Sequence, residues 1–103
     1  MPTIKAKLLI HRKERNAEGH ITELKAWIVP VTEHTPNGLK YSVVYIVNGI
    51  RVVGYDNERG KVDHRHFAGV ETPYTFINMA QLIAEINADV TRYLEGDDNE
   101  SDL

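Results

Sequence analysis

One segment near the middle of the chain holds most of the side chains that could do chemistry. Residues 55–66 read YDNERGKVDHRH, with a glycine in the middle. Tyr, Asp, Asn, Lys, Arg and His together supply proton donors, proton acceptors and fixed positive charge, which attack on a phosphodiester requires. A pair such as His64 and His66, flanked by arginine and lysine, is unusual in a surface hairpin, and imidazoles exchange protons near neutral pH. The segment therefore indicates acid–base chemistry.

Three interpretations of this histidine pair are open. In the first, one ring acts as base and the other as acid in metal-independent cleavage of RNA, where the ribose 2′-hydroxyl is the nucleophile. In the second, both rings bind a metal together with Asp56 or Asp63, although a catalytic metal normally takes three protein ligands and the third has no clear candidate. In the third, the rings hydrogen-bond Asp56 and Asn57 and only brace a hairpin.

The first interpretation, RNA cleavage, gives each polar residue a role. The two histidines would perform acid–base work, the arginines would hold phosphate, and a tyrosine and an aspartate would orient them. The predicted catalytic residues are His64, His66, Arg51, Tyr55 and Asp56, and the predicted substrate-binding residues are Arg65, Lys61 and Asn57. No metal ligand and no cofactor is predicted.

Alternating apolar and polar residues predict strands over the first two thirds of the chain. In the first strand, Ile4, Ala6, Leu8 and Ile10 would share one apolar face. Asn48-Gly49 lies between two apolar runs and is the strongest hairpin signal, since a type I′ turn needs positive φ at both central residues. Strands are expected near residues 4–15, 21–31, 41–47, 50–55 and 61–67. Short connections between them predict an antiparallel meander.

The lengths of two turns predict which side chains meet, because paired residues point to the same side of a sheet. A two-residue turn at 48–49 and a four-residue loop at 57–60 give the pairs Val47–Ile50, Ile46–Arg51, Val44–Val53, Ser42–Tyr55, Asp56–Lys61, Tyr55–Val62, Val53–His64 and Arg51–His66. One face would then gather Arg51, Tyr55, His64 and His66. The opposite face, with Val43, Tyr45, Val47, Ile50, Val52 and Phe67, would support a helix.

That helix is expected near the C-terminus. Asn78 is a suitable N-cap with Gln81 at the third helical position, and Gly96 is a suitable end. Met79, Leu82, Ile83, Ile86, Val90 and Tyr93 follow the spacing of one helical face. The sequence thus predicts one α+β domain over residues 1–95, with about five strands in an antiparallel meander and one C-terminal amphipathic helix packed on one face. Residues 96–103 are expected to form an acidic, disordered tail.

Composition limits the remaining choices. The 103 residues carry a net charge of −3, but five of the 15 acids lie in residues 95–103, so the rest of the chain has 12 basic and 10 acidic residues. An acidic end of this kind keeps a protein in solution or covers a basic site. There is no cysteine, hence no disulfide, and no apolar run approaches the length of a membrane span. A cytoplasmic protein that does not associate with membranes is expected.

Several motifs resemble those of the TumE family, a group of small toxins of toxin–antitoxin systems. The resemblance rests on Tyr55-Asp56-Asn57, Gly60-Lys61, His64-Arg65-His66, Pro73-Tyr74-x-Phe76 and the amphipathic helix with Leu82. It covers roughly residues 40–93. The resemblance implies a prokaryotic, cytoplasmic toxin that is neutralised by a helix-turn-helix antitoxin and that blocks translation as a ribonuclease acting on cellular RNA. The alternative function is a non-catalytic module that binds nucleic acid or protein, and the oligomeric state is left open.

Overall fold

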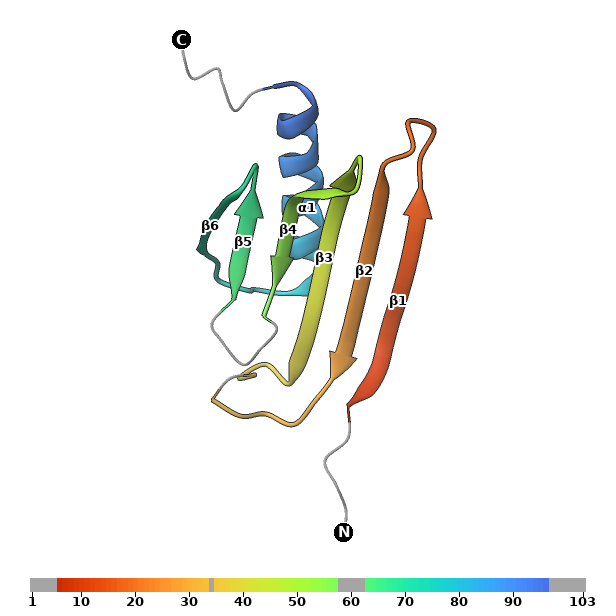
Figure 1. Ribbon diagram of the computed structural model, residues 1–103. Helices are drawn as coiled ribbons and strands as arrows, with labels where there is room; N and C mark the ends of the chain where they lie inside the picture. Colours follow the sequence, from red (N-terminus) through yellow and green to blue (C-terminus); the bar gives the residue numbers. More distant parts are fainter. Residues whose placement is uncertain (1–5, 34, 58–62, 97–103) are drawn as a thin grey trace.

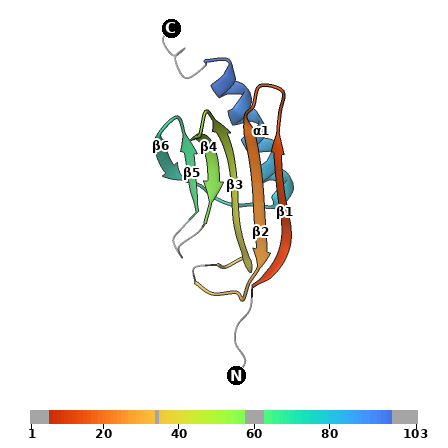
Figure 2. The same ribbon diagram turned by 45° about the vertical axis from the view of Figure 1, so that its right-hand side comes forward.

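Over the residues that the structure describes, six strands form one antiparallel sheet, and one helix lies on one side of it (Figures 1 and 2). The computed structural model describes residues 6–33, 35–57 and 63–96. Each strand pairs with its neighbours in sequence, in the order β1 (Lys7–Arg15), β2 (Ile21–Ile28), β3 (Leu39–Val47), β4 (Ile50–Asp56), β5 (His64–Phe67) and β6 (Val70–Pro73). This confirms the predicted α+β meander, with β6 as one strand more than the five expected.

The helix α1 (Met79–Leu94) starts and ends where the sequence predicts. The side chain of Asn78 accepts a hydrogen bond of 2.8 Å from the backbone N–H of Gln81, so the first turn is capped. At the other end the backbone N–H of Glu95 bonds to Thr91, and Gly96 follows with a φ of 70°. Within the described ranges, no helix is long and apolar enough to cross a membrane.

The core lies between α1 and one face of the sheet. Leu82 and Ile86 of the helix are buried against apolar and aromatic side chains of the central strands. The sheet contributes Ala26, Tyr41, Val43, Tyr45, Val52, Val53, Tyr55 and Phe67. Residues 74–78 pass behind the sheet to reach the helix (Figure 1), and Tyr74 and Phe76 pack against the same core. The opposite side of the sheet, here called the open face, is not covered by the helix.

The predicted pairing of β3 with β4 is correct only near the turn. Asn48 and Gly49 have φ values of 52° and 80°, as a type I′ turn requires, and the pairs Val47–Ile50 and Ile46–Arg51 are present. A bulge then intervenes, so that the next pair is Tyr45–Val53. The predicted pairs Val44–Val53 and Ser42–Tyr55 are therefore wrong, because Val52 is an extra residue in β4.

The pairing of β4 with β5 also differs from the prediction. The observed pairs are Val53–Phe67, Gly54–His66, Tyr55–Arg65 and Asp56–His64, which makes the connection between the strands longer than the predicted four residues. The pairs Val53–His64 and Arg51–His66 are thus wrong. The pairs Asp56–Lys61 and Tyr55–Val62 are wrong too, since Asp56 and Tyr55 have other partners. As a result, Val53 and Tyr55 face the helix instead of the open face.

The prediction of a single apolar face in the first strand is wrong, because β1 contains a bulge. Leu8 pairs with Trp27, whereas Ile10 pairs with Ala26, so the alternation is interrupted between them and the two side chains lie on different faces. Leu8 and Leu9 are both more than half exposed. The predicted acidic tail lies outside the described residues beyond Gly96, as do Ile4 and the start of the first strand.

Candidate active site

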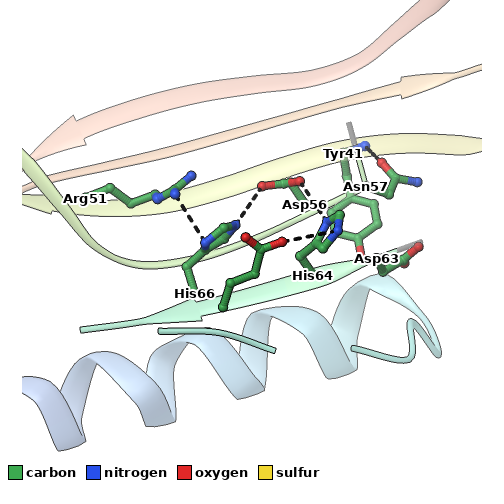
Figure 3. Close-up of polar contacts among 8 residues, drawn as sticks. Tyr41, Arg51, Asp56, Asn57, Asp63, His64 and His66 are labelled. Atoms are coloured by element: carbon green, nitrogen blue, oxygen red, sulfur yellow. Dashed lines mark hydrogen bonds and ion pairs between the residues drawn. The ribbon is translucent and has the colours of Figure 1, made fainter. Parts of the chain in front are cut away.

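Four of the predicted catalytic residues meet on the open face. Asp56 lies between the two histidines: its Oδ1 is 3.8 Å from Nδ1 of His64, and its Oδ2 is 3.5 Å from Nε2 of His66 (Figure 3). Nη2 of Arg51 is 3.2 Å from Nδ1 of His66. On the far side, Nε2 of His64 is 3.3 Å from a carboxylate oxygen of Glu71. These five residues are called the Asp56 cluster below.

Cross-strand pairing brings the cluster together. Asp56 pairs with His64, and His66 pairs with Gly54 on β4 and with Glu71 on β6, so all these positions face the same way. Arg51 joins them because the bulge at Val52 returns it to the open face. The side chains of Asp56, His64 and His66 are each only 15–16% exposed, which holds the two imidazoles in place while leaving one edge accessible.

The partners of each ring indicate where its protons lie. A guanidinium has only N–H donors, so Nδ1 of His66 must accept from Arg51, and the ring proton is carried by Nε2, toward Asp56. Both nitrogens of His64 instead face carboxylates, those of Asp56 and Glu71. The two rings thus differ in their partners: His66 lies between a guanidinium and a carboxylate, and His64 lies between two carboxylates.

A glycine makes room for Arg51. Gly54 is the cross-strand partner of His66. Because glycine has no side chain, the space between the His66 ring and β3 is left free. A Cβ at this position would lie 3.1 Å from Cδ of Arg51 and 3.3 Å from the carbonyl oxygen of Val43. The arginine side chain therefore crosses over Gly54 to reach His66. On the other side of the cluster, His64, Glu71, Thr72 and Pro73 line a hollow of about 300 Å³ next to the His64 ring.

Tyr55 and Arg65, both predicted for the site, lie on the opposite side of the sheet. They are cross-strand partners that face α1, where both bind the buried Asp89. The hydroxyl of Tyr55 donates to Asp89 at 2.5 Å, and Arg65 donates to its two oxygens at 2.7 and 2.9 Å. Burial raises the pKa of Tyr55, and the bond to Asp89 adds to this; the same carboxylate raises the pKa of Arg65. These two residues connect sheet and helix.

Asn57 is buried and bonds to the backbone of β3. Its Oδ1 accepts from the N–H of Tyr41 at 2.9 Å, and its Nδ2 donates to the carbonyl of Leu39 at 2.8 Å (Figure 3). These bonds hold the end of β4 against β3. Asp63 accepts a hydrogen bond of 2.6 Å from the hydroxyl of Tyr41, away from the histidines. Lys61 lies outside the described residues.

Three residues that contact or make room for the predicted site residues were missed in the sequence. Asp89 carried a usable signal, since it is an acid three residues after Ile86 on the apolar face of the helix. Gly54 interrupts an apolar strand, which is a sign of close approach by another group. Glu71 gave no signal, because its place beside His64 depends on β6.

The Asp56 cluster can exchange protons and can bind an anion through Arg51. Among the residues whose placement is given, no three His, Cys, Asp or Glu side chains are grouped so as to hold a metal ion. The arrangement contains the two imidazoles and the guanidinium that the first of the three interpretations of the histidine pair requires. It also retains part of the third, since Asp56 does contact both rings, whereas Asn57 contacts neither of them in the hydrogen bonds described.

Comparison with known proteins gives one match. Searches of curated proteins and of solved structures found nothing that matches the chain. The model of the family described as Toxin TumE matches residues 4–94, which span both the sheet and the helix, including the whole Asp56 cluster. Because the match covers most of the 103 residues, the chain belongs to the TumE toxin family.

Proposed function

We propose that this protein is the toxin of a toxin–antitoxin pair and that it cleaves cellular RNA without a metal, using the Asp56 cluster. The observation that carries the proposal is the position of Asp56 between two histidines, one of which also contacts Arg51 and the other Glu71. Acid–base cleavage of RNA needs one group that accepts a proton and one that gives a proton. The pair supplies both, next to a guanidinium.

In the proposed reaction, His66 takes the proton of the ribose 2′-hydroxyl, and the resulting oxygen attacks the adjacent phosphorus. The bond from phosphorus to the 5′-oxygen breaks, and His64 gives its proton to that oxygen. The products are a 2′,3′-cyclic phosphate and a 5′-hydroxyl. The two ring centroids are 6.3 Å apart, close enough for both imidazoles to reach one phosphodiester bound at the accessible edge of the cluster. Arg51 leaves Nδ1 of His66 when phosphate binds, and its N–H donors then stabilise the charge on the phosphorane.

Membership of a toxin family implies an antitoxin partner. We propose that this partner is a helix-turn-helix protein, and that the toxin acts in the cytoplasm, where cellular RNA is found. The basic residues around the Asp56 cluster would be the surface that an antitoxin has to cover in order to block cleavage. This would make neutralisation a direct competition with RNA.

The test is induced expression of the wild type and of His64→Ala, His66→Ala and Arg51→Ala, with growth and RNA integrity followed together. His20→Ala is the matched control, because His20 lies apart from the cluster and contacts Tyr45. The proposal predicts that the three site variants permit growth and leave RNA intact, while the control remains toxic. Growth arrest with intact RNA, or toxicity that survives both histidine substitutions, would contradict it.

The second candidate is a non-catalytic protein that acts by occupying RNA or a protein. It is favoured by the contacts that His64 and His66 already make within the cluster, which a purely structural role would also explain. Purified protein that binds RNA but yields no product after long incubation would support this alternative. Multiple turnover of a defined oligonucleotide would exclude it.

A further inference from the structure

We propose that the open face of the sheet binds a single strand of RNA and leads it into the Asp56 cluster. This inference rests on the proposed function, since it names the substrate path of the same site. The face lies opposite α1, and its residues follow from the pairing of the strands. Three observations carry the inference: a continuous polar row across the sheet, the excess of cations on it, and a partly exposed tryptophan near the end of β2.

The polar row runs from the first strand to the site. Cross-strand partners link His11 to Lys25, Lys25 to Ser42, Ser42 to Asp56 and Asp56 to His64. Because partners point to the same side of a sheet, these five side chains line one path on the open face. Four steps between neighbouring strands give a path of roughly 19 Å. Such a path is long enough to contact more than one nucleotide on one side of the scissile phosphate.

Cations outnumber acids on the open face. Register assigns to this face the cations Lys13, Arg15, Lys25, Lys40 and Arg51 and the acids Glu23, Asp56 and Glu71. Each of the acids lies against a histidine: Glu23 is 2.8 Å from His11, and the other two contact the histidines of the site. Phosphate backbones are attracted by such an excess of lysine and arginine. The charge argues for a nucleic acid as occupant.

Trp27 gives the face an aromatic platform. It pairs with Lys40 on β3, and it is partly exposed. The ammonium group of Lys25 lies 5.9 Å from the centre of its ring. Unpaired bases stack on exposed aromatic rings while neighbouring cations hold the backbone, and this combination is typical of proteins that bind single strands. A duplex would present no free base to Trp27, so the occupant we infer is single-stranded.

Binding is measured with a 2′-O-methyl oligonucleotide, which the proposed reaction cannot cleave, by fluorescence anisotropy at several salt concentrations. The variants are Lys13→Ala, Lys25→Ala and Trp27→Ala. The matched control is Arg12→Ala, because Arg12 is the neighbour of Lys13 on the same strand and its partner Leu24 faces the core. Melting temperatures are compared so that any loss of fold is recognised.

Each lysine variant should weaken binding about three- to tenfold at low salt. It should also reduce the slope of log affinity against log salt by about 0.7, the value for one phosphate contact in a single strand. Trp27→Ala should weaken binding about tenfold with the slope unchanged, since stacking involves no phosphate. Arg12→Ala should bind as the wild type does. Equal losses of affinity in Arg12→Ala and Lys13→Ala would overturn the inference. Normal binding by Lys25→Ala and Trp27→Ala would also overturn it.

The same variants separate this inference from the proposed function. If they lose RNA binding while the wild type cleaves no RNA, the open face is confirmed as a binding surface and the ribonuclease proposal fails. If the wild type cleaves RNA and the variants cleave and bind it equally well, the ribonuclease proposal stands and the open face is not the path. Loss of antitoxin binding alone, with RNA binding intact, would also overturn the inference in favour of a protein partner.

Discussion

Arg51 contacts His66 although the two residues are not cross-strand partners. Nη2 of the arginine lies 3.2 Å from Nδ1 of the imidazole, while the partner of His66 on β4 is Gly54. The contact forms because the bulge at Val52 turns Arg51 to the open face and because the glycine leaves space for its side chain. It fixes the proton of His66 on Nε2, which is why this relationship matters for the chemistry.

Replacing Gly54 by alanine should therefore disable Arg51 without touching a charged residue. The new Cβ would lie 3.1 Å from Cδ of Arg51, whose flexible side chain would move away from His66. We expect toxicity to fall to the level of Arg51→Ala, with a loss of stability of about 1 kcal/mol from local overpacking. The measurement is growth inhibition together with denaturant unfolding. In the double variant Gly54→Ala/Arg51→Ala, the two losses of toxicity should not add. Full additivity would show that Gly54 does not act through Arg51.

The contact between Asp89 and Arg65 should matter for stability rather than for catalysis. Asp89→Ala leaves the guanidinium of Arg65, only 26% exposed, without its carboxylate, and should lower the free energy of unfolding by about 3 kcal/mol. Arg92→Ala is the control. Its guanidinium lies 3.5 Å from the same carboxylate but is 47% exposed, so the loss should be about 1 kcal/mol or less. Chemical denaturation measures the free energy of unfolding of both variants. Equal losses in Asp89→Ala and Arg92→Ala would contradict the assignment of the Asp89–Arg65 contact to stability.

High pH should destabilise the fold through two buried tyrosines. Burial raises the pKa of Tyr41 and of Tyr55, and hydrogen bonds to Asp63 and Asp89 add to the effect. Because the folded-state pKa exceeds the unfolded value of about 10, the unfolded chain releases protons first. Stability is therefore complete below pH 10 and falls above it, by up to about 1.4 kcal/mol per pH unit for each tyrosine.

Unfolding of Tyr55→Phe at pH 8 and pH 11 checks this. The variant lacks one of the two groups, so its stability should fall less between the two pH values than that of the wild type. The difference in the free energy of unfolding between wild type and variant would then be smaller at pH 11 than at pH 8. If this difference were the same at both pH values, unfolding would not change the pKa of Tyr55, and the prediction would be wrong.

Local sequence signals predicted the elements well. Asn48-Gly49 marked its hairpin because few other dipeptides tolerate positive φ twice. Asn78 marked the start of the helix because its side chain caps the free N–H of Gln81. The strand β6 was missed since it is short and follows a turn at Ala68-Gly69, where Ala68 has a φ of 50° that alanine rarely adopts. Alanine at such a position gives no warning of a turn.

Side-chain placement was harder to predict because it depends on register. Val52 and Val53 are identical in type, so nothing local indicates which of them is the extra residue of the bulge. The presence of the bulge, rather than which valine forms it, turns Tyr55 toward the helix, where its hydroxyl donates to Asp89. The bulge and the longer β4–β5 connection both shift the register, and together they keep Arg51 and His66 on one face. The predicted contact of these two residues is therefore present, but by a different pairing.

The chemistry of the RNA ends tests the central claim most directly. An RNA oligonucleotide and its fully 2′-O-methylated form are incubated with wild type and His66→Ala in the presence of EDTA, and the products are identified by mass spectrometry. The account predicts 2′,3′-cyclic phosphate and 5′-hydroxyl ends from the RNA, no cleavage of the methylated strand, and a rate at least about 100-fold lower for His66→Ala. Products with 5′-phosphate ends, cleavage of the methylated strand, or cleavage abolished by EDTA would contradict it.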